Sequence, residues 1–167
     1  MPAVRVLVSH DDDGTVIAVD TDDNRLALAK KLGVYVIINS KTQNARDAII
    51  NATDGGGANV AVECVGAPET FSMAADVLRP GGWLANIGIH GVPVELALEL
   101  LWIRNVTITT GLVDIRELPT LLKLVQSERL DITPLCSHAL SLDEGEKAHD
   151  VFSNAAVNKA LKVTIRP

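Results

Sequence analysis

The sequence predicts an α/β fold in which a mostly parallel sheet carries helices on both faces. Short apolar runs alternate along the chain with helical segments, and glycine or proline separates them. The runs are continuously apolar, which is typical of parallel strands that are covered on both faces. The chain is 47% hydrophobic but only 3% aromatic, so its core is aliphatic and suits alternating strands and helices.

The elements follow one another in this rhythm from the first apolar run to the last. Thr21 is the expected cap of the first helix, aspartates follow at its positive end, and Gly33 ends it. Pro68 is acceptable in the first turn of a later helix, and Ser141 with Glu144 has the spacing of a capping box. The expected strands span residues 4–8, 16–20, 35–38, 59–65, 83–88, 106–110, 137–140 and 160–165. The expected helices span about 22–32, 42–51, 68–78, 119–127 and 142–154, and residues 95–102 form a short amphipathic segment.

Length and charge restrict the class of protein further. The 167 residues suit a single domain, 1–167, of which residues 1–14 form a divergent first segment. A net charge of −6 argues against nucleic acid or an anionic membrane as a partner. Cys64 and Cys136 belong to no metal-binding spacing and suit a reducing compartment, and no apolar run is long enough to span a bilayer. We expect a cytoplasmic protein.

A carboxylate at the end of the second strand is the most informative residue. Asp20 follows a continuous apolar strand and precedes a capped helix, which is where a dinucleotide-binding fold holds the ribose hydroxyls of adenosine. Such a carboxylate also repels a 2′-phosphate and so selects NAD over NADP. Arg25, one turn into the helix, is within reach of the same ribose. The alternatives are a polar strand terminus for Asp20 and a solvated helix charge for Arg25.

Longer segments carry a family resemblance. They are VIAVDTDDNRLALAKKLG, NVAVECVGAPETFSMAADVLRPGGWLANIGIHG, LWIRNVTITTGLVD and SHALSLDEGEKAHDVFSNAAVNKALKVTIRP. In this order they resemble the Rossmann-like nucleotide-binding domain of the zinc-dependent alcohol dehydrogenases, within the medium-chain dehydrogenase/reductase superfamily. The resemblance implies NAD as cofactor, zinc in full-length relatives, and hydride transfer between an alcohol carbon and nicotinamide.

Position by position, the resemblance implies a set of cofactor-binding residues. Asp20 and Arg25 resemble the ribose pair, and Val65 with Gly66 the loop that packs on adenine. Ile87, Gly88 and Ile89 resemble the strand end whose backbone holds the nicotinamide side. Leu112, after Gly111, resembles the next such loop, and Lys162 resembles a cation near the pyrophosphate, with a surface lysine as the alternative.

No catalytic residue and no metal ligand are expected in these residues. His90 follows the end of a strand, where sites form in open α/β sheets, but a loop histidine is the favoured interpretation. His138 is interpreted as structural. No set of His, Cys and acidic side chains has the spacing of metal ligands, so we expect no zinc site.

The sequence departs from the family at its beginning. The 167 residues contain no GxGxxG turn, and aspartates at positions 11–13 stand where backbone amides of relatives neutralise a pyrophosphate. We therefore expect NAD binding to be weak or lost and alcohol oxidation to be weak or absent in this chain alone.

Two alternatives remain open at this stage. One is a non-enzymatic module that forms homo-oligomers through the region from Leu101 to Thr110, where relatives have their subunit contact. The other is a methyltransferase-like domain that binds S-adenosylmethionine.

Overall fold

The computed structural model describes the backbone of residues 6–10 and both backbone and side chains of residues 14–111 and 115–167. Contacts within the chain divide it into two compact units. The first unit ends at Gly111, and the second comprises the residues that follow. Each unit has its own sheet and is described separately.

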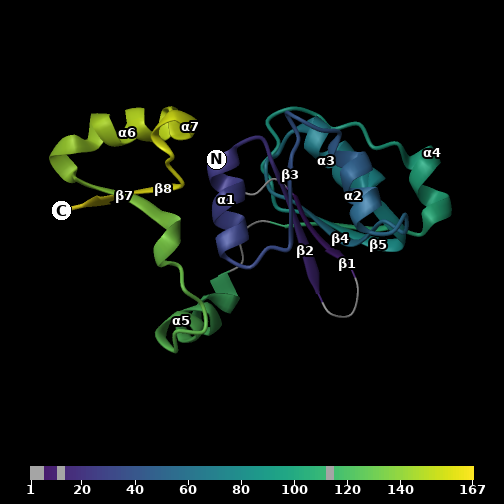
Figure 1. Cartoon of the computed structure of the whole chain (residues 1–167), viewed down its shortest axis with the longest axis horizontal. Coiled ribbons are helices and arrows are strands. Elements are labelled where there is room, and N and C mark those ends of the chain that lie inside the picture. The colour runs from purple at the N-terminus through teal and green to yellow at the C-terminus, as the bar shows by residue number, and fades with distance from the viewer. Residues whose placement is uncertain (1–5, 11–13, 112–114) are drawn as a thin grey trace. The chain divides into compact units, whose positions relative to one another are not determined.

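The first unit is built on a six-stranded sheet with the order β3-β2-β1-β4-β5-β6 (Figure 1). Its strands are β1 (Val6–His10), β2 (Thr15–Asp20), β3 (Val36–Asn39), β4 (Ala58–Glu63), β5 (Leu78–Asn86) and β6 (Thr107–Thr110). Five of them run in the same direction, and β1 alone runs antiparallel to both of its neighbours. The α/β, Rossmann-like, mostly parallel fold expected from the sequence is confirmed.

The reversed β1 follows from the short connection to β2. Two parallel neighbours need a crossover of a dozen or more residues, whereas only residues 11–14 separate His10 from Thr15. A strand joined so closely to the next can pair with it only as an antiparallel neighbour, and His10 accordingly lies opposite Thr15. The central position of the sheet is therefore filled without a following helix.

Helices cover both faces of this sheet (Figure 1). Ala18 of β2 packs with Leu26 and Ala29 of the first helix on one face. Ile17 and Val19 belong to the larger cluster on the opposite face, where the second and third helices pack. The helices of the unit are α1 (Asp23–Lys31), α2 (Ala45–Ala52), α3 (Pro68–Asp76), α4 (Leu98–Leu101) and the 3₁₀ turn η1 (Trp102–Arg104).

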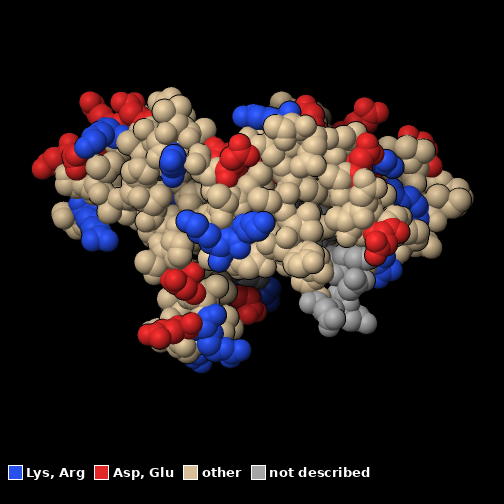
Figure 2. Space-filling view, viewed as in Figure 1, with Lys and Arg blue, Asp and Glu red and all other residues tan. Residues whose placement is uncertain are grey.

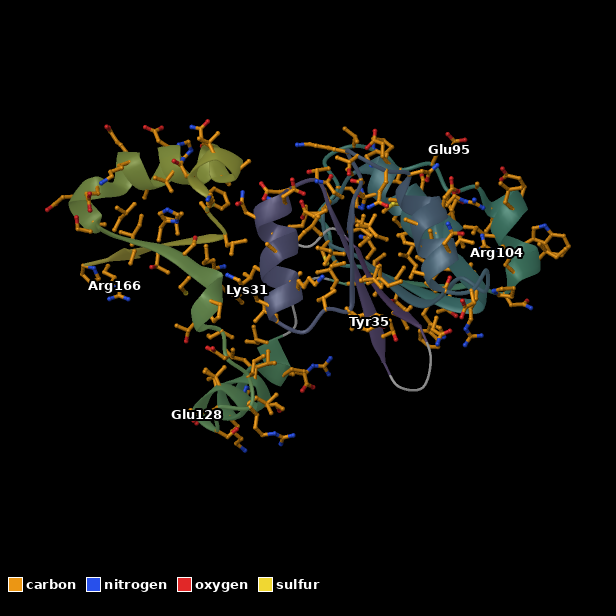
Figure 3. The ribbon with its side chains drawn as sticks, in the orientation of Figure 1. Lys31, Tyr35, Glu95, Arg104, Glu128 and Arg166 are labelled. Carbon is orange, nitrogen blue, oxygen red and sulfur yellow. The ribbon has the colours of Figure 1, made fainter. Side chains whose placement is uncertain are left out.

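Two local details differ from the expectation. The cap of α1 is Asp22 and not Thr21, because the Asp22 carboxylate accepts hydrogen bonds from the N–H groups of Asn24 and Arg25. Strand β5 begins at Leu78 and not near Trp83. Its pairing with β4 is irregular over the Pro-Gly-Gly segment that lies between Leu78 and Trp83. Arg104, labelled in Figure 3, donates to the carbonyl oxygens of Asp76 and Leu78 and so ties η1 to the start of β5.

The second unit has a small sheet of two parallel strands. Ser141 and Glu144 form the expected capping box, and α6 packs against β8. Among the residues of this unit that the structure describes, the buried apolar ones are Ala148 and Ala160. Its elements are η2 (Ile115–Glu117), α5 (Leu118–Gln126), η3 (Thr133–Leu135), β7 (Cys136–Ser141), η4 (Leu142–Glu144), α6 (Gly145–Ser153), α7 (Ala155–Asn158) and β8 (Lys162–Arg166).

The distribution of charged side chains and the length of the helices concern nucleic-acid and membrane partners. Acidic and basic side chains are interspersed among uncharged residues on the face shown in Figure 2. Within the described ranges, every helix is too short or too polar to cross a lipid bilayer.

Candidate functional site at the carboxyl edge of the sheet

Polar side chains end three strands of the first unit that run in the same direction. Asp20 ends β2, Glu63 ends β4 and Asn86 ends β5. The register places them at one edge, because Val6 of β1 lies opposite both Val19 and Glu63, and Glu63 lies beside Asn86. In open α/β sheets, ligands bind at this carboxyl edge.

Asp20 is fully buried and forms a two-pronged ion pair with Arg25. Its Oδ1 accepts from the backbone N–H of Thr21 (2.6 Å) and of Asp22 (2.8 Å) and from Nη2 of Arg25 (2.7 Å). Its Oδ2 accepts from Nε of Arg25 at 3.0 Å. The hydrogen bond to Asp20 raises the pKa of the Arg25 guanidinium above its usual value. The structure thus brings the two predicted ribose residues together.

Glu63 is a second fully buried carboxylate, at the end of β4. Its Oε1 accepts from the N–H groups of Val65 (2.8 Å) and Gly66 (3.0 Å) and from the hydroxyl of Thr70 (2.6 Å). Its Oε2 accepts from the Gly66 N–H at 3.1 Å. The carboxylate therefore fixes the loop between β4 and α3.

The loop after β5 is held against the same carboxylate. Nε2 of His90 lies 2.9 Å from Oδ1 of Asn86 and 3.6 Å from Oε2 of Glu63. Both neighbours are acceptors, so Nε2 carries the proton and donates. Nδ1 of His90 is buried without a hydrogen-bond partner among the described residues, and the ring meets Phe71 edge-on at 5.9 Å.

The two loops approach each other backbone to backbone. A Cβ atom added to Gly66 would collide with the carbonyl oxygen of Ile89, and one added to Gly88 would collide with the Gly66 N–H and with Oε2 of Glu63. Gly66 also has a φ of +81°, which favours glycine. These two positions need glycine because no side chain fits between the loops.

The remaining predicted residues fall into two groups. Val65 is half-buried, whereas Ile87 and Ile89 are 60% and 74% exposed beside the contact between the loops. Lys162 is an exposed residue of β8 and belongs to the second unit. Leu112 lies outside the described residues.

Sequence reasoning missed Glu63, Thr70 and Asn86. The available signal was a single acidic residue inside an otherwise apolar strand, since a carboxylate at a buried strand position needs several donors around it. In the part of the chain that the structure describes, no group of three His, Cys, Asp or Glu side chains could hold a metal ion.

These observations define the class of protein as a Rossmann-like α/β domain with a buried aspartate at the end of β2. Residues 6–127 match the model of the zinc-binding dehydrogenases. The chain belongs to the zinc-binding dehydrogenase family, and it is an alcohol dehydrogenase-like cofactor domain.

Individual relatives agree with this assignment. The chain is 30% identical over 157 residues to an alcohol dehydrogenase of Cupriavidus necator, which covers 92% of the chain and 43% of the relative. It is 41% identical to the zinc-dependent alcohol dehydrogenase 2 of Streptococcus pneumoniae, with a TM-score of 0.86 over 92% of the chain and 45% of that structure. A zinc-binding dehydrogenase from Sinorhizobium meliloti bound to NADP is 25% identical, with a TM-score of 0.81 over 92% of the chain and 45% of that structure. The chain thus spans less than half the length of these relatives.

Proposed function

We propose that this chain binds NAD(H) at the carboxyl edge of its sheet, as the cofactor-binding part of a zinc-type alcohol dehydrogenase. The observation that carries the proposal is the Asp20–Arg25 pair at the end of β2. Oδ2 of Asp20 accepts one hydrogen bond from Arg25, which leaves acceptor capacity for a ribose hydroxyl. The guanidinium of Arg25 carries more donors than the two that hold Asp20.

The other predicted residues extend this site. We assign Val65 and Gly66 to the adenine side, and Ile87, Gly88 and Ile89 to the nicotinamide side. The exposure of Ile87 and Ile89 supports the assignment, because an apolar side chain at the rim of a site is available to pack on a ring. Leu112 and Lys162 stay predictions from the resemblance.

The chain fits the adenosine half of NAD better than the pyrophosphate. A dinucleotide fold neutralises the phosphates with a glycine-rich turn and the amino end of the helix after the first strand. Here β1 runs in the opposite direction and leads through four residues directly into β2. We therefore propose that NAD(H) binding is weak and rests mainly on the adenosine side.

When bound, the cofactor would exchange a hydride with an alcohol or aldehyde carbon, as the family assignment suggests. This chain's own residues would hold and orient the adenosine and fix the loops beside the nicotinamide. Zinc belongs to the full-length relatives in this proposal, and we propose little or no turnover by the 167 residues alone. A cytoplasmic location also stays a proposal.

Calorimetric titration with NADH tests the proposal. We expect saturable binding by the unchanged protein and roughly ten-fold weaker binding by Asp20→Asn, which loses the charge that holds Arg25. The matched control is Asp47→Asn, because Asp47 also pairs with an arginine, Arg46 at 3.6 Å, but is exposed and is not among the residues assigned to the cofactor. Absence of binding, or equal weakening by both substitutions, would refute the proposal.

Self-association is a second proposal, favoured by the edge strand β6. This strand pairs only with β5 in the described sheet, and residues 101–110 also contain Trp102 and Ile103, each 69% exposed. Unpaired edges and exposed apolar side chains favour pairing with another chain. Light scattering after size exclusion should show a dimer or larger oligomer that Trp102→Glu converts to a monomer, whereas a monomer at high concentration would exclude it. The methyltransferase alternative finds no support in the comparisons above.

A further inference from the structure

Glu63 holds three separate segments of the chain at one point. Its carboxylate accepts from the backbone of the loop after β4 and from the hydroxyl of Thr70 on α3. Its own backbone carbonyl accepts from the N–H groups of Ile87 (2.8 Å) and Gly88 (3.0 Å) at the end of β5. His90, further along the same loop, places Nε2 3.6 Å from Oε2.

These bonds determine where the two loops lie relative to each other. The contact between Gly66 and the segment from Gly88 to Ile89 involves backbone atoms, so no side chain between the loops can adjust to a displacement. A carboxylate that accepts from several N–H groups is held in one orientation, because turning it breaks several charge-assisted hydrogen bonds together. Glu63 is fully buried, so water cannot replace these bonds.

We propose that Glu63 is a positioning residue for the cofactor, which sets the loop of Val65 and Gly66 against the loop from Ile87 to His90. The inference rests on the proposed binding of NAD(H), since these are the loops assigned to the adenine and nicotinamide sides. Glu63 itself does not touch the cofactor in this proposal. Its charge and its acceptors act through the backbone of the residues that do.

The opposite end of β4 provides a matched control. Thr53 is 1% exposed, and its hydroxyl donates to the carbonyl oxygens of Ile49 (3.0 Å) and Ile50 (3.1 Å) while it accepts from the Gly57 N–H at 3.1 Å. It thus fixes the loop that enters β4, as Glu63 fixes the loop that leaves it. A substitution there perturbs the same strand and core at the amino edge, away from the proposed cofactor.

The experiment compares NADH affinity by calorimetry and thermal unfolding for Glu63→Gln and Thr53→Val in the full chain. Both substitutions should lower the melting temperature. Only Glu63→Gln should weaken NADH binding, by roughly ten-fold, because the amide group replaces one acceptor and removes the charge. Thr53→Val should change the affinity by less than about two-fold, because Thr53 is distant from the proposed cofactor site and substitutions at distant sites act independently.

A second pair of substitutions, with a smaller effect on the fold, tests the same proposal if Glu63→Gln fails to fold. Thr70→Val removes one donor to Oε1 of Glu63, and Thr70→Ser keeps it. We expect Thr70→Val to weaken NADH binding and Thr70→Ser to retain it. Equal affinities across all four variants would overturn the positioning role and leave the proposed function intact. Absence of binding by the unchanged protein would overturn both.

Discussion

Two fully buried carboxylates at the carboxyl edge, Asp20 and Glu63, occupy similar positions on either side of β1 but are stabilised differently. Asp20 has a cationic partner, Arg25, in two hydrogen bonds as well as two backbone amides. Glu63 has two backbone amides and a hydroxyl, and Nε2 of His90 lies 3.6 Å from its Oε2. The Asp20 site is a charge pair at the start of a helix, whereas the Glu63 site is a junction between loops.

This difference indicates what each carboxylate can do. A charge pair with a long and partly exposed side chain can rearrange around a ligand, since Arg25 has rotatable bonds and is 14% exposed. A carboxylate surrounded by backbone amides cannot rearrange unless the loops move with it. We therefore associate Asp20 with direct contact to the cofactor and Glu63 with the geometry of the site.

The largest expected effect is the loss of the Glu63 junction. Glu63→Ala leaves two N–H groups and a hydroxyl without their acceptor, and we expect the free energy of unfolding to fall by about 3–5 kcal/mol. Urea denaturation measures the change. Exposed Glu69 on the neighbouring α3 is the control, because Glu69→Ala should stay within about 0.5 kcal/mol. A fall of less than about 1 kcal/mol for Glu63→Ala would show that the donors find other partners.

The next effect tests the backbone contact beside Glu63. Gly66 and Gly55 have the same φ of +81°, but a Cβ at Gly55 meets nothing within 4 Å. Gly55→Ala therefore measures the cost of the backbone conformation alone, about 1–2 kcal/mol. Gly66→Ala should cost about 1–3 kcal/mol more, because the Ile89 carbonyl must move. Equal losses in thermal or urea unfolding would contradict the close contact.

Removal of the Asp20 partner should have a smaller effect on stability. Arg25→Ala leaves Asp20 with its two backbone amides, and we expect a loss of roughly 2–3 kcal/mol. Arg46→Ala, which breaks an exposed pair with Asp47, should cost less than about 1 kcal/mol. Arg25→Lys should recover only part of the loss, because an ammonium group cannot reproduce the fork of two parallel bonds. Full recovery in the same denaturation assay would show that charge alone matters.

The smallest effect concerns the thiol next to Glu63. Burial raises the pKa of Cys64, and the negative charge of Glu63 raises it further. The folded state therefore holds the thiol proton more tightly than the unfolded state, so this contribution to stability is lost as pH rises through the folded-state value. At about pH 8, Cys64 should react with iodoacetamide more slowly than exposed Cys136, and Glu63→Gln should speed it a few-fold. Mass spectrometry of the labelled peptides measures both rates. A Cys64 rate that is the same in Glu63→Gln and in the unchanged protein would show that the charge of Glu63 does not influence the thiol.

The proximity of Asp20 and Arg25 was predictable from the sequence because both lie within one short segment. The strand, the carboxylate and Arg25 span residues 15–25, and their order alone places them together. The choice of Asp22 over Thr21 as the helix cap was not predictable, since both side chains suit that position.

The Glu63 junction depends on contacts between segments that are distant in sequence. His90 and Gly88 reach Glu63 only because β4 and β5 pair in parallel, which places the ends of both strands at one edge. The sequence favours a loop histidine at position 90, and His90 does lie in the loop after β5. Its contacts with Asn86 and Glu63 could be predicted only with the register of the sheet. The direction of β1 follows from its short connection, although the sequence did not show which neighbours it would have.

The most direct test of the central claim is a titration of the isotope-labelled chain with NADH, followed by the backbone amide signals in nuclear magnetic resonance. We expect the amide signals of Thr21 and Asp22, and those of Val65, Gly66 and Gly88, to shift together and to saturate at one affinity. Signals that stay unchanged at these residues, or that change only in the second unit, would contradict a cofactor site at the carboxyl edge of the sheet.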